Sequence, residues 1–98
     1  MNLSVSASAL QDLEEAAAWY NREKPGLGDD LADAFEAAAH RIRERPEIGS
    51  AFWIGERKLV MRRFPYSVIY RVEDDTVFVL AFAHHRRKPG YWRDEEAG

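Results

Sequence analysis

The sequence predicts an α+β fold, in which a helical hairpin packs on one face of a mostly antiparallel sheet in the order β-α-α-β-β-β. The first half of the chain contains two stretches with apolar residues three and four positions apart, which is the period of an amphipathic helix. The second half contains three stretches with the period of strands. A length of 98 residues suits one domain, spanning residues 1–98.

Residues 2–6 alternate between polar and apolar side chains, which predicts a short strand that is half buried. Ser6 and Ser8 are both candidate N-caps for the helix that follows, and Ser8 with Gln11 has the spacing of a capping box. This helix is expected to end at residues 24–26, because the residue before a proline is biased away from helical backbone angles.

A second helix is expected to start at Asp29 or Asp30 and to stop at Pro46. The link between the two helices is short, so they are predicted to form an antiparallel hairpin. Each helix has one polar face and needs a second layer against its apolar face. Closely spaced alanines in the second helix allow a neighbouring element to approach, at positions 32, 34, 37, 38 and 39.

Residues 46–56 are expected to form a loop, because they contain a proline and two glycines. Strands are predicted at 57–64, 67–72 and 76–83. The last of these is apolar on both faces, which places it in the interior of the sheet. The acidic residues 73–75 form a turn-prone link, so the last two strands are expected to pair as a hairpin.

The composition is that of a soluble globular protein, with 46% apolar and 32% charged residues. The absence of cysteine excludes disulfides, thiolate metal ligands and a cysteine nucleophile. The longest apolar run is far shorter than a membrane helix of about 20 residues, and the N-terminus lacks the features of a signal peptide. We therefore expect a cytoplasmic protein with no membrane partner. No phosphate-binding loop or catalytic serine motif is present, and no cofactor is expected.

Charge is distributed unevenly along the chain. The net charge of −3 argues against a nucleic-acid partner when taken alone. Residues 57–93 nevertheless contain nine Lys and Arg against three Asp and Glu, a local charge of +6. Because partners respond to local fields, this half of the chain is the candidate docking surface for an anionic partner.

Alternation along the first strand of this basic half predicts two basic faces. Lys58, Val60 and Arg62 share one face, whereas Arg57 and Arg63 share the other. The helices cover one face, so the other is expected to be open to solvent, where it can bind RNA or an acidic protein segment. The alternative is a sheet face that is kept soluble by its charge.

The most unusual segment is 84–93, His-His-Arg-Arg-Lys-Pro-Gly-Tyr-Trp-Arg. Guanidinium groups bind phosphate and aromatic rings stack on bases, so this segment suits contact with a nucleic acid. The alternative is a solvated strand end whose aromatic residues pack a tail against the sheet. His84 and His85 are expected to point to opposite faces of a strand, so no metal site is predicted. One of the two is a candidate general acid or base.

Three segments, 62–66 (Arg-Arg-Phe-Pro-Tyr), 69–72 (Ile-Tyr-Arg-Val) and 84–92, occur in the predicted element order. In this combination, almost the whole chain resembles the RelE/ParE superfamily of toxins from bacterial type II toxin–antitoxin modules. The resemblance implies a small toxin that a cognate antitoxin holds inactive, and a role in plasmid stabilisation. It also implies one of two targets. RelE-like members cleave mRNA in the ribosome without a metal, whereas ParE-like members inhibit DNA gyrase.

The resemblance implies four catalytic residues if the protein is a nuclease. Lys58 matches a strand lysine linked to proton abstraction, Arg62 a phosphate-binding arginine, and Arg86 an arginine linked to transition-state charge. His85 is a further candidate acid or base, as histidines are in some nucleases of the superfamily. In the superfamily, a tyrosine near the end of the chain stacks on a base of the RNA. The resemblance therefore implies that four residues at the end of this chain contact the target or RNA: Arg87, Tyr91, Trp92 and Arg93.

The match to the nuclease pattern is incomplete, because Val60 and Ser67 stand where a lysine and an arginine are expected. The missing cations would stabilise the charge that builds on the phosphate, and each such group is worth several kcal/mol. The prediction is therefore a ParE-like toxin that binds a protein such as DNA gyrase. A RelE-like ribosome-dependent endoribonuclease and a non-toxic homologue that only binds the antitoxin are the alternatives.

Overall fold

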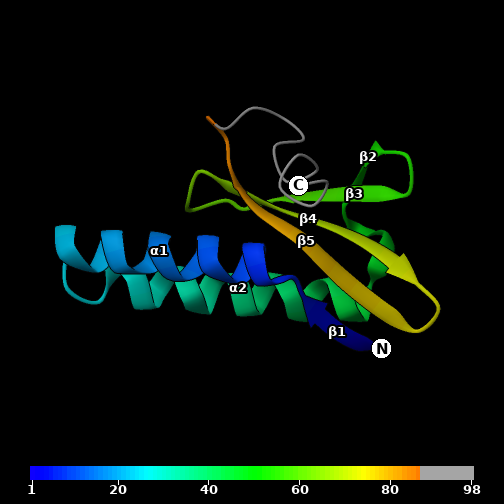
Figure 1. The fold of residues 1–98 in the computed structure, drawn as a ribbon, viewed down its shortest axis with the longest axis horizontal. Helices are drawn as coiled ribbons and strands as arrows, with labels where there is room; N and C mark the ends of the chain where they lie inside the picture. Colours follow the sequence, from blue (N-terminus) through cyan, green and yellow to red (C-terminus); the bar gives the residue numbers. More distant parts are fainter. Residues whose placement is uncertain (87–98) are drawn as a thin grey trace.

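The computed structural model describes residues 1–86, which form two long helices and a five-stranded sheet (Figure 1). The helices lie side by side along the sheet, so the α+β class and the helical hairpin expected from the sequence are confirmed. In chain order the elements are β1 (Asn2–Val5), α1 (Ala7–Glu23), α2 (Leu27–Glu44), the 3-10 helix η1 (Pro46–Ile48), β2 (Ser50–Trp53), β3 (Glu56–Val60), β4 (Tyr66–Glu73) and β5 (Thr76–His84).

The sheet has the strand order β1-β5-β4-β3-β2. β1 pairs in parallel with β5, and all other neighbouring strands are antiparallel. β5 lies between β1 and β4, which confirms the interior position predicted for it. The hairpin between β4 and β5 is also confirmed, and its turn places Asp74 in the left-handed region at φ 55°. The sheet contains one strand more than predicted, because β2 forms within the segment expected to be a loop.

The first helix is capped by Ser6 and not by Ser8, which lies inside the first turn of α1. The Ser6 hydroxyl accepts a hydrogen bond from the Ala9 amide and donates one to the Leu80 carbonyl, both at 3.1 Å. Ser8 has the right spacing from Gln11 but comes two residues too late. The cap therefore also fixes the start of α1 to strand β5.

The second helix starts at Leu27, earlier than the two aspartates expected from the sequence. Its first turn is capped from the neighbouring helix, because the Asn21 side-chain oxygen accepts hydrogen bonds from Gly26 and Gly28 at 3.1 and 2.8 Å. A Cβ on Gly28 would lie only 1.9 Å from the Ala17 carbonyl oxygen. The absence of that atom lets the two helices touch at the closed end of the hairpin.

Side chains are buried on both faces of the sheet. Between the sheet and the helices lies the main core, which includes Leu31, Ile42, Tyr70 and Phe82. A smaller cluster on the opposite face is formed by Ile69, Leu80 and Ala81, with Phe52, Phe78 and Ala83 packed against it. Burial on both faces explains why β5 reads as a nearly continuous apolar run.

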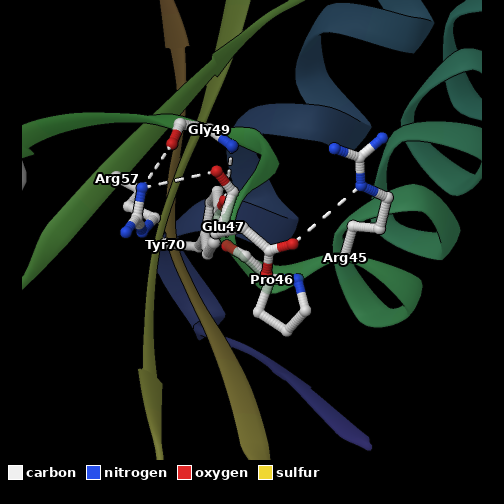
Figure 2. A network of polar contacts seen from close by, with 6 residues as sticks. All are labelled: Arg45, Pro46, Glu47, Gly49, Arg57 and Tyr70. Carbon is white, nitrogen blue, oxygen red and sulfur yellow. Dashed lines mark hydrogen bonds and ion pairs between the residues drawn. The ribbon is translucent and has the colours of Figure 1, made fainter.

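The connection from α2 to the sheet is an ordered segment and not the predicted loop (Figure 2). The buried hydroxyl of Tyr70 donates to the Pro46 carbonyl at 2.6 Å and accepts from the Gly49 amide at 2.8 Å. The Arg57 guanidinium donates to the Gly49 carbonyl at 2.8 Å. These bonds satisfy the backbone of η1 and set the point where β2 begins.

Strand β3 is shorter than predicted and ends at Val60 instead of residue 64. The Met61 amide donates to the Tyr66 carbonyl at 2.9 Å, which closes the link between β3 and β4. Residues 62–65 bend away from strand geometry, and Pro65 cannot donate to a strand ladder. The alternation of side chains between the two faces of the sheet therefore stops before Arg62.

Removing the Tyr70 hydroxyl is expected to destabilise the protein, because Tyr70→Phe leaves the Gly49 amide and the Pro46 carbonyl without their buried partner. The expected loss is about 1–3 kcal/mol in the free energy of unfolding. Urea denaturation followed by circular dichroism measures it. Tyr20→Phe is the matched control, since the Tyr20 hydroxyl makes no hydrogen bond within residues 1–86, and it should change stability by less than about 0.5 kcal/mol.

Gly49→Ala tests the same connection from the other side. A Cβ at this position would lie 2.7 Å from the Tyr70 hydroxyl oxygen and 2.8 Å from its ring. The overpacking is expected to cost about 1–3 kcal/mol. Wild-type stability of both Tyr70→Phe and Gly49→Ala would show that the connection does not hold the fold.

Candidate functional site

The face of the sheet that points away from the helices is the first candidate surface. We call it the outer face and define it by Phe52, Lys58, Ser67, Arg71 and Phe78. Register places Lys58 opposite Ile69, and Arg71 opposite Phe78. Paired residues in antiparallel strands point to the same face, so these side chains stand with the smaller apolar cluster and not with the main core.

Cations on the outer face lie over aromatic rings. The Lys58 ammonium is 5.0 Å from the centre of the Phe52 ring, and the Arg71 guanidinium carbon is 5.1 Å from the centre of the Phe78 ring. Arg71 also forms an ion pair with Glu73 at 3.3 Å. A cation over a ring keeps its charge while its stem covers apolar surface. The outer face is therefore both basic and apolar.

His85 is held against the outer face by Ser67, whose hydroxyl lies 3.1 Å from the ring nitrogen Nε2. The serine is only 3% exposed, whereas the histidine is exposed. An arginine at position 67 would have to place a long charged side chain in a closed site. The sequence indicated both residues separately, but only the fold brings them together.

His84 points to the opposite side of β5, as the sequence predicted. Its ring packs edge-on against Tyr66, with ring centres 5.0 Å apart, and its Nδ1 accepts a hydrogen bond from the Arg86 amide at 3.0 Å. Burial lowers the pKa of His84, and the nearby charges of Arg86 and His85 lower it further. An Nδ1 that accepts a hydrogen bond carries no proton, so the neutral ring is protonated at Nε2.

Lys58 and Arg62 do not share a sheet face, and this prediction was wrong because β3 ends between them. Arg62 instead lines a groove of about 220 Å³ between α2 and the end of β3. We call this the arginine groove. Its lining residues are Ala34, Ala37, Ala38 and Arg41 of α2 with Leu59, Val60, Met61, Arg62 and Arg63.

The other two arginines of this region have partners within the fold. Arg63 forms an ion pair with Asp30 of α2 at 3.1 Å, and its guanidinium carbon lies 5.2 Å from the centre of the Phe64 ring. Arg57 donates to the connection before β2. Neither is a free cation for a ligand.

The remaining predicted site residues are placed only in part. Arg86 is exposed in the turn after β5. The expected contact residues at the end of the chain lie outside the described part of the structure: Arg87, Tyr91, Trp92 and Arg93. Within residues 1–86, no group of three candidate ligands for a metal ion is present, and neither helix has the length and apolar content needed to cross a membrane.

Comparison with known structures supports the fold. A chain from the structure described as the chromosomal ParDE TA system from P. aeruginosa matches with a TM-score of 0.64 and 18% identity. The match covers 86% of this chain and 95% of that chain. This chain therefore shares its fold with a chain of that structure.

Comparison of sequences identifies the family. Residues 3–89 match the model of the ParE toxin of type II toxin-antitoxin system, parDE. Toxin ParE2 of Mycobacterium tuberculosis, in strains CDC 1551 / Oshkosh and ATCC 25618 / H37Rv, is 30% identical over 97 residues, which is 98% of this chain and 92% of the relative. The chain belongs to the ParE toxin family of type II toxin–antitoxin systems, which confirms the resemblance found in its sequence.

The low pKa of His84 predicts a pH dependence of stability. The folded state favours the neutral ring, so the stability it contributes is complete above the unfolded-state pKa of about 6.5. It is lost as the pH falls through the lower folded-state pKa. NMR titration of the His84 ring should therefore give a midpoint below 6.5.

Arg86→Gln removes one cause of this pKa shift and should move the midpoint upward, while burial of the ring keeps it below the ordinary value. Arg22→Gln, at the end of α1, is the charge-matched control and should leave it unchanged. A midpoint at or above 6.5 in the wild type would contradict the neutral, hydrogen-bonded His84.

Proposed function

We propose that this ParE-family toxin inhibits growth in the cytoplasm by binding DNA gyrase, and that a cognate antitoxin neutralises it. The observation that carries the proposal is the absence of cationic side chains at positions 60 and 67, where the nuclease pattern has a lysine and an arginine. Val60 is an apolar side chain that is 52% exposed, and Ser67 is buried under its neighbours. The outer face therefore lacks the two cations that mRNA cleavage by RelE-like relatives is expected to need.

The energetics favour binding over cleavage. Attack of a ribose hydroxyl on phosphate builds negative charge, and losing one positioned donor costs about 3–4 kcal/mol of barrier. Two losses leave Lys58 and Arg71 as the strand cations of the outer face, and Arg71 is already paired with Glu73. His85 supplies an acid or base but no fixed positive charge.

Exposed apolar residues beside the outer face support a protein target. The end of β2 presents Trp53 at 59% exposure, and the turn that follows presents Ile54 at 94% exposure. We call these two residues the β2 tip. Tryptophan is enriched among the residues that dominate protein–protein binding energy.

Gyrase inhibition by the purified toxin, measured by supercoiling of relaxed plasmid, tests the target. Inhibition is expected at stoichiometric toxin. Trp53→Ala should raise the concentration for half inhibition at least 10-fold, because a binding hot spot contributes about 2 kcal/mol or more. Trp19→Ala is the matched control, since Trp19 is also half exposed but lies on α1.

A different result would identify the alternative function. If supercoiling is unaffected at excess toxin, the gyrase target is wrong. If translated mRNA is then cut in the ribosomal A site, and His85→Ala abolishes the cuts, the protein is a RelE-like nuclease. The pairing of His85 with Ser67 is the observation that favours this second candidate.

Expression of the chain alone is expected to stop cell growth. We expect the antitoxin to be encoded next to the toxin, and co-expression of that neighbouring protein should restore growth. Growth rate and viable counts after induction measure both effects. Normal growth without the neighbouring protein would indicate a homologue that has lost its toxicity. Continued arrest with that protein present would exclude it as the antitoxin.

A further inference from the structure

A further candidate surface is the open edge of the sheet at β1. Within residues 1–86, β1 pairs with β5 on one side and with no strand on the other. The amides of Asn2 and Ser6 donate toward β5, with N···O distances of 2.8 and 2.9 Å. Backbone groups of alternate residues in a strand point to opposite sides, so those of Leu3 and Val5 point to the open edge. These groups are available to a further strand.

This edge carries none of the features that usually prevent edge pairing, which are charged side chains, prolines and bulges. The sequence of β1, Asn2–Val5, is uncharged, and the strand pairs with β5 without a shift in register. The other edge strand, β2, has an irregular register between Ala51 and Trp53. Leu3 is apolar and nevertheless 36% exposed. Of the two edges, β1 is therefore the one suited to regular pairing.

A groove of about 340 Å³ lies beside β1, between this strand and α2. We call it the β1 groove. Arg43 links the helix to the strand, because its Nε donates to the Met1 carbonyl at 3.0 Å. That carbonyl oxygen has a second lone pair for another donor. The lining combines an apolar floor with a charged rim and consists of Leu3, Phe35, Glu36, Ala39, His40 and Arg43.

The sequence of β1 is complementary to itself in antiparallel pairing. A pair centred on Leu3 sets this residue opposite its counterpart across a two-fold axis, where the two exchange both backbone hydrogen bonds. The same register sets Asn2 opposite Ser4, so polar side chains meet on the solvent face. It also sets Met1 opposite Val5, so apolar side chains meet on the face toward the helices. Such matched cross-strand pairs stabilise a sheet.

The charges on α2 are arranged around the same axis. Glu36 and Arg43 lie two helical turns apart, on either side of Ala39, and Leu3 lines the groove between them. A two-fold axis at Leu3 sets α2 antiparallel to its counterpart, so each Glu36 faces the Arg43 of the other copy. Within the described residues, Glu36 forms neither an ion pair nor a hydrogen bond, and Arg43 uses only its Nε. Strand and helix therefore fit one partner with one symmetry operation.

We infer that two copies of this chain form a two-fold dimer, in which the β1 strands pair and the two sheets become one sheet of ten strands. The occupant of the edge is a second copy because the same patch supplies both halves of every contact, as an isologous interface requires. The inference goes beyond the proposed function and does not rest on it. β2 is the opposite edge of each sheet, so the dimer leaves both β2 tips exposed (Figure 1).

The first test is the mass of the toxin alone, measured by sedimentation at concentrations from about 1 to 300 μM. The paired strands are short, so the interface is small and the dimer is expected to dissociate in the micromolar range. Leu3→Lys sets two ammonium groups opposite each other and should weaken dimerisation at least 10-fold. Leu10→Lys is the matched control at an exposed leucine of α1 and should leave dimerisation unchanged.

A charge exchange tests the two-fold arrangement itself. Glu36→Arg and Arg43→Glu should each weaken dimerisation at least 10-fold, because each places like charges opposite each other. An equal mixture of the two single variants should dimerise within about threefold of wild type, since both cross-pairs are then opposite in charge. Glu14→Arg, at an exposed position of α1, is the control and should behave as wild type. Thermal unfolding of each variant separates lost pairing from lost folding.

Three results would overturn the inference. The first is a wild-type chain that stays monomeric up to about 300 μM, well above the expected dissociation constant. The second is a dimer that Leu3→Lys does not weaken although the variant is folded. The third is a mixture of Glu36→Arg and Arg43→Glu that stays as weak as either variant alone. If the Leu3 amide of a monomeric wild type is protected from hydrogen exchange only with the neighbouring protein present, the edge belongs to that protein. All of these results leave the gyrase proposal standing, because they are measured on a different edge of the sheet.

Discussion

The hydrogen bonds of the Tyr70 hydroxyl determine where the two halves of the molecule meet. The phenol is buried in the core between helices and sheet, yet its oxygen reaches the backbone that leaves α2. Without that bridge, the turn at η1 would leave buried backbone groups unpaired, which is costly in an apolar interior. The bridge fixes the position of β2 and β3 relative to α2. The arginine groove and the outer face both follow from that position.

The two faces of the sheet differ in their surroundings. One face is covered by the helices and holds most of the buried side chains. The outer face combines a small apolar cluster with cations over aromatic rings. Position 67 illustrates the division, because a short side chain there closes the surface and positions His85 in place of a long cation. A short side chain at this position changes the chemistry of the surface while the fold keeps its shape.

The periodicity of apolar residues made most of the fold predictable. The turn and capping residues did not predict where every element starts and ends. The helices and the β4–β5 hairpin were predicted because their apolar residues repeat over many positions. β2 was missed because it is four residues long and has a glycine near each end, which reads as a loop. The start of α2 was misplaced because its cap, Asn21, belongs to the preceding helix. Each miss depends on a contact made across the fold.

The site residues were predictable as chemical types but not as neighbours. Lys58 and Arg62 were predicted to share a face, because nothing in the sequence marks the end of β3 at Val60. The alanines of α2 were recognised as places of close approach, but their combination with Arg41 and Arg62 needs the bend after β3. The partnership of Ser67 with His85 spans 18 positions and has no local signal.

The parallel pairing of β1 with β5 gives the chain a particular order of assembly. The first strand, starting at Asn2, can pair with β5 only when residues from Thr76 onward have been synthesised. The hydrogen bond from Ser6 to the Leu80 carbonyl also needs this late part of the chain. Contacts between such distant parts of a chain form late, because they close the longest loops. A chain that stops partway therefore lacks the sheet that covers its helical hairpin, so the complete fold forms only after nearly the whole message has been translated.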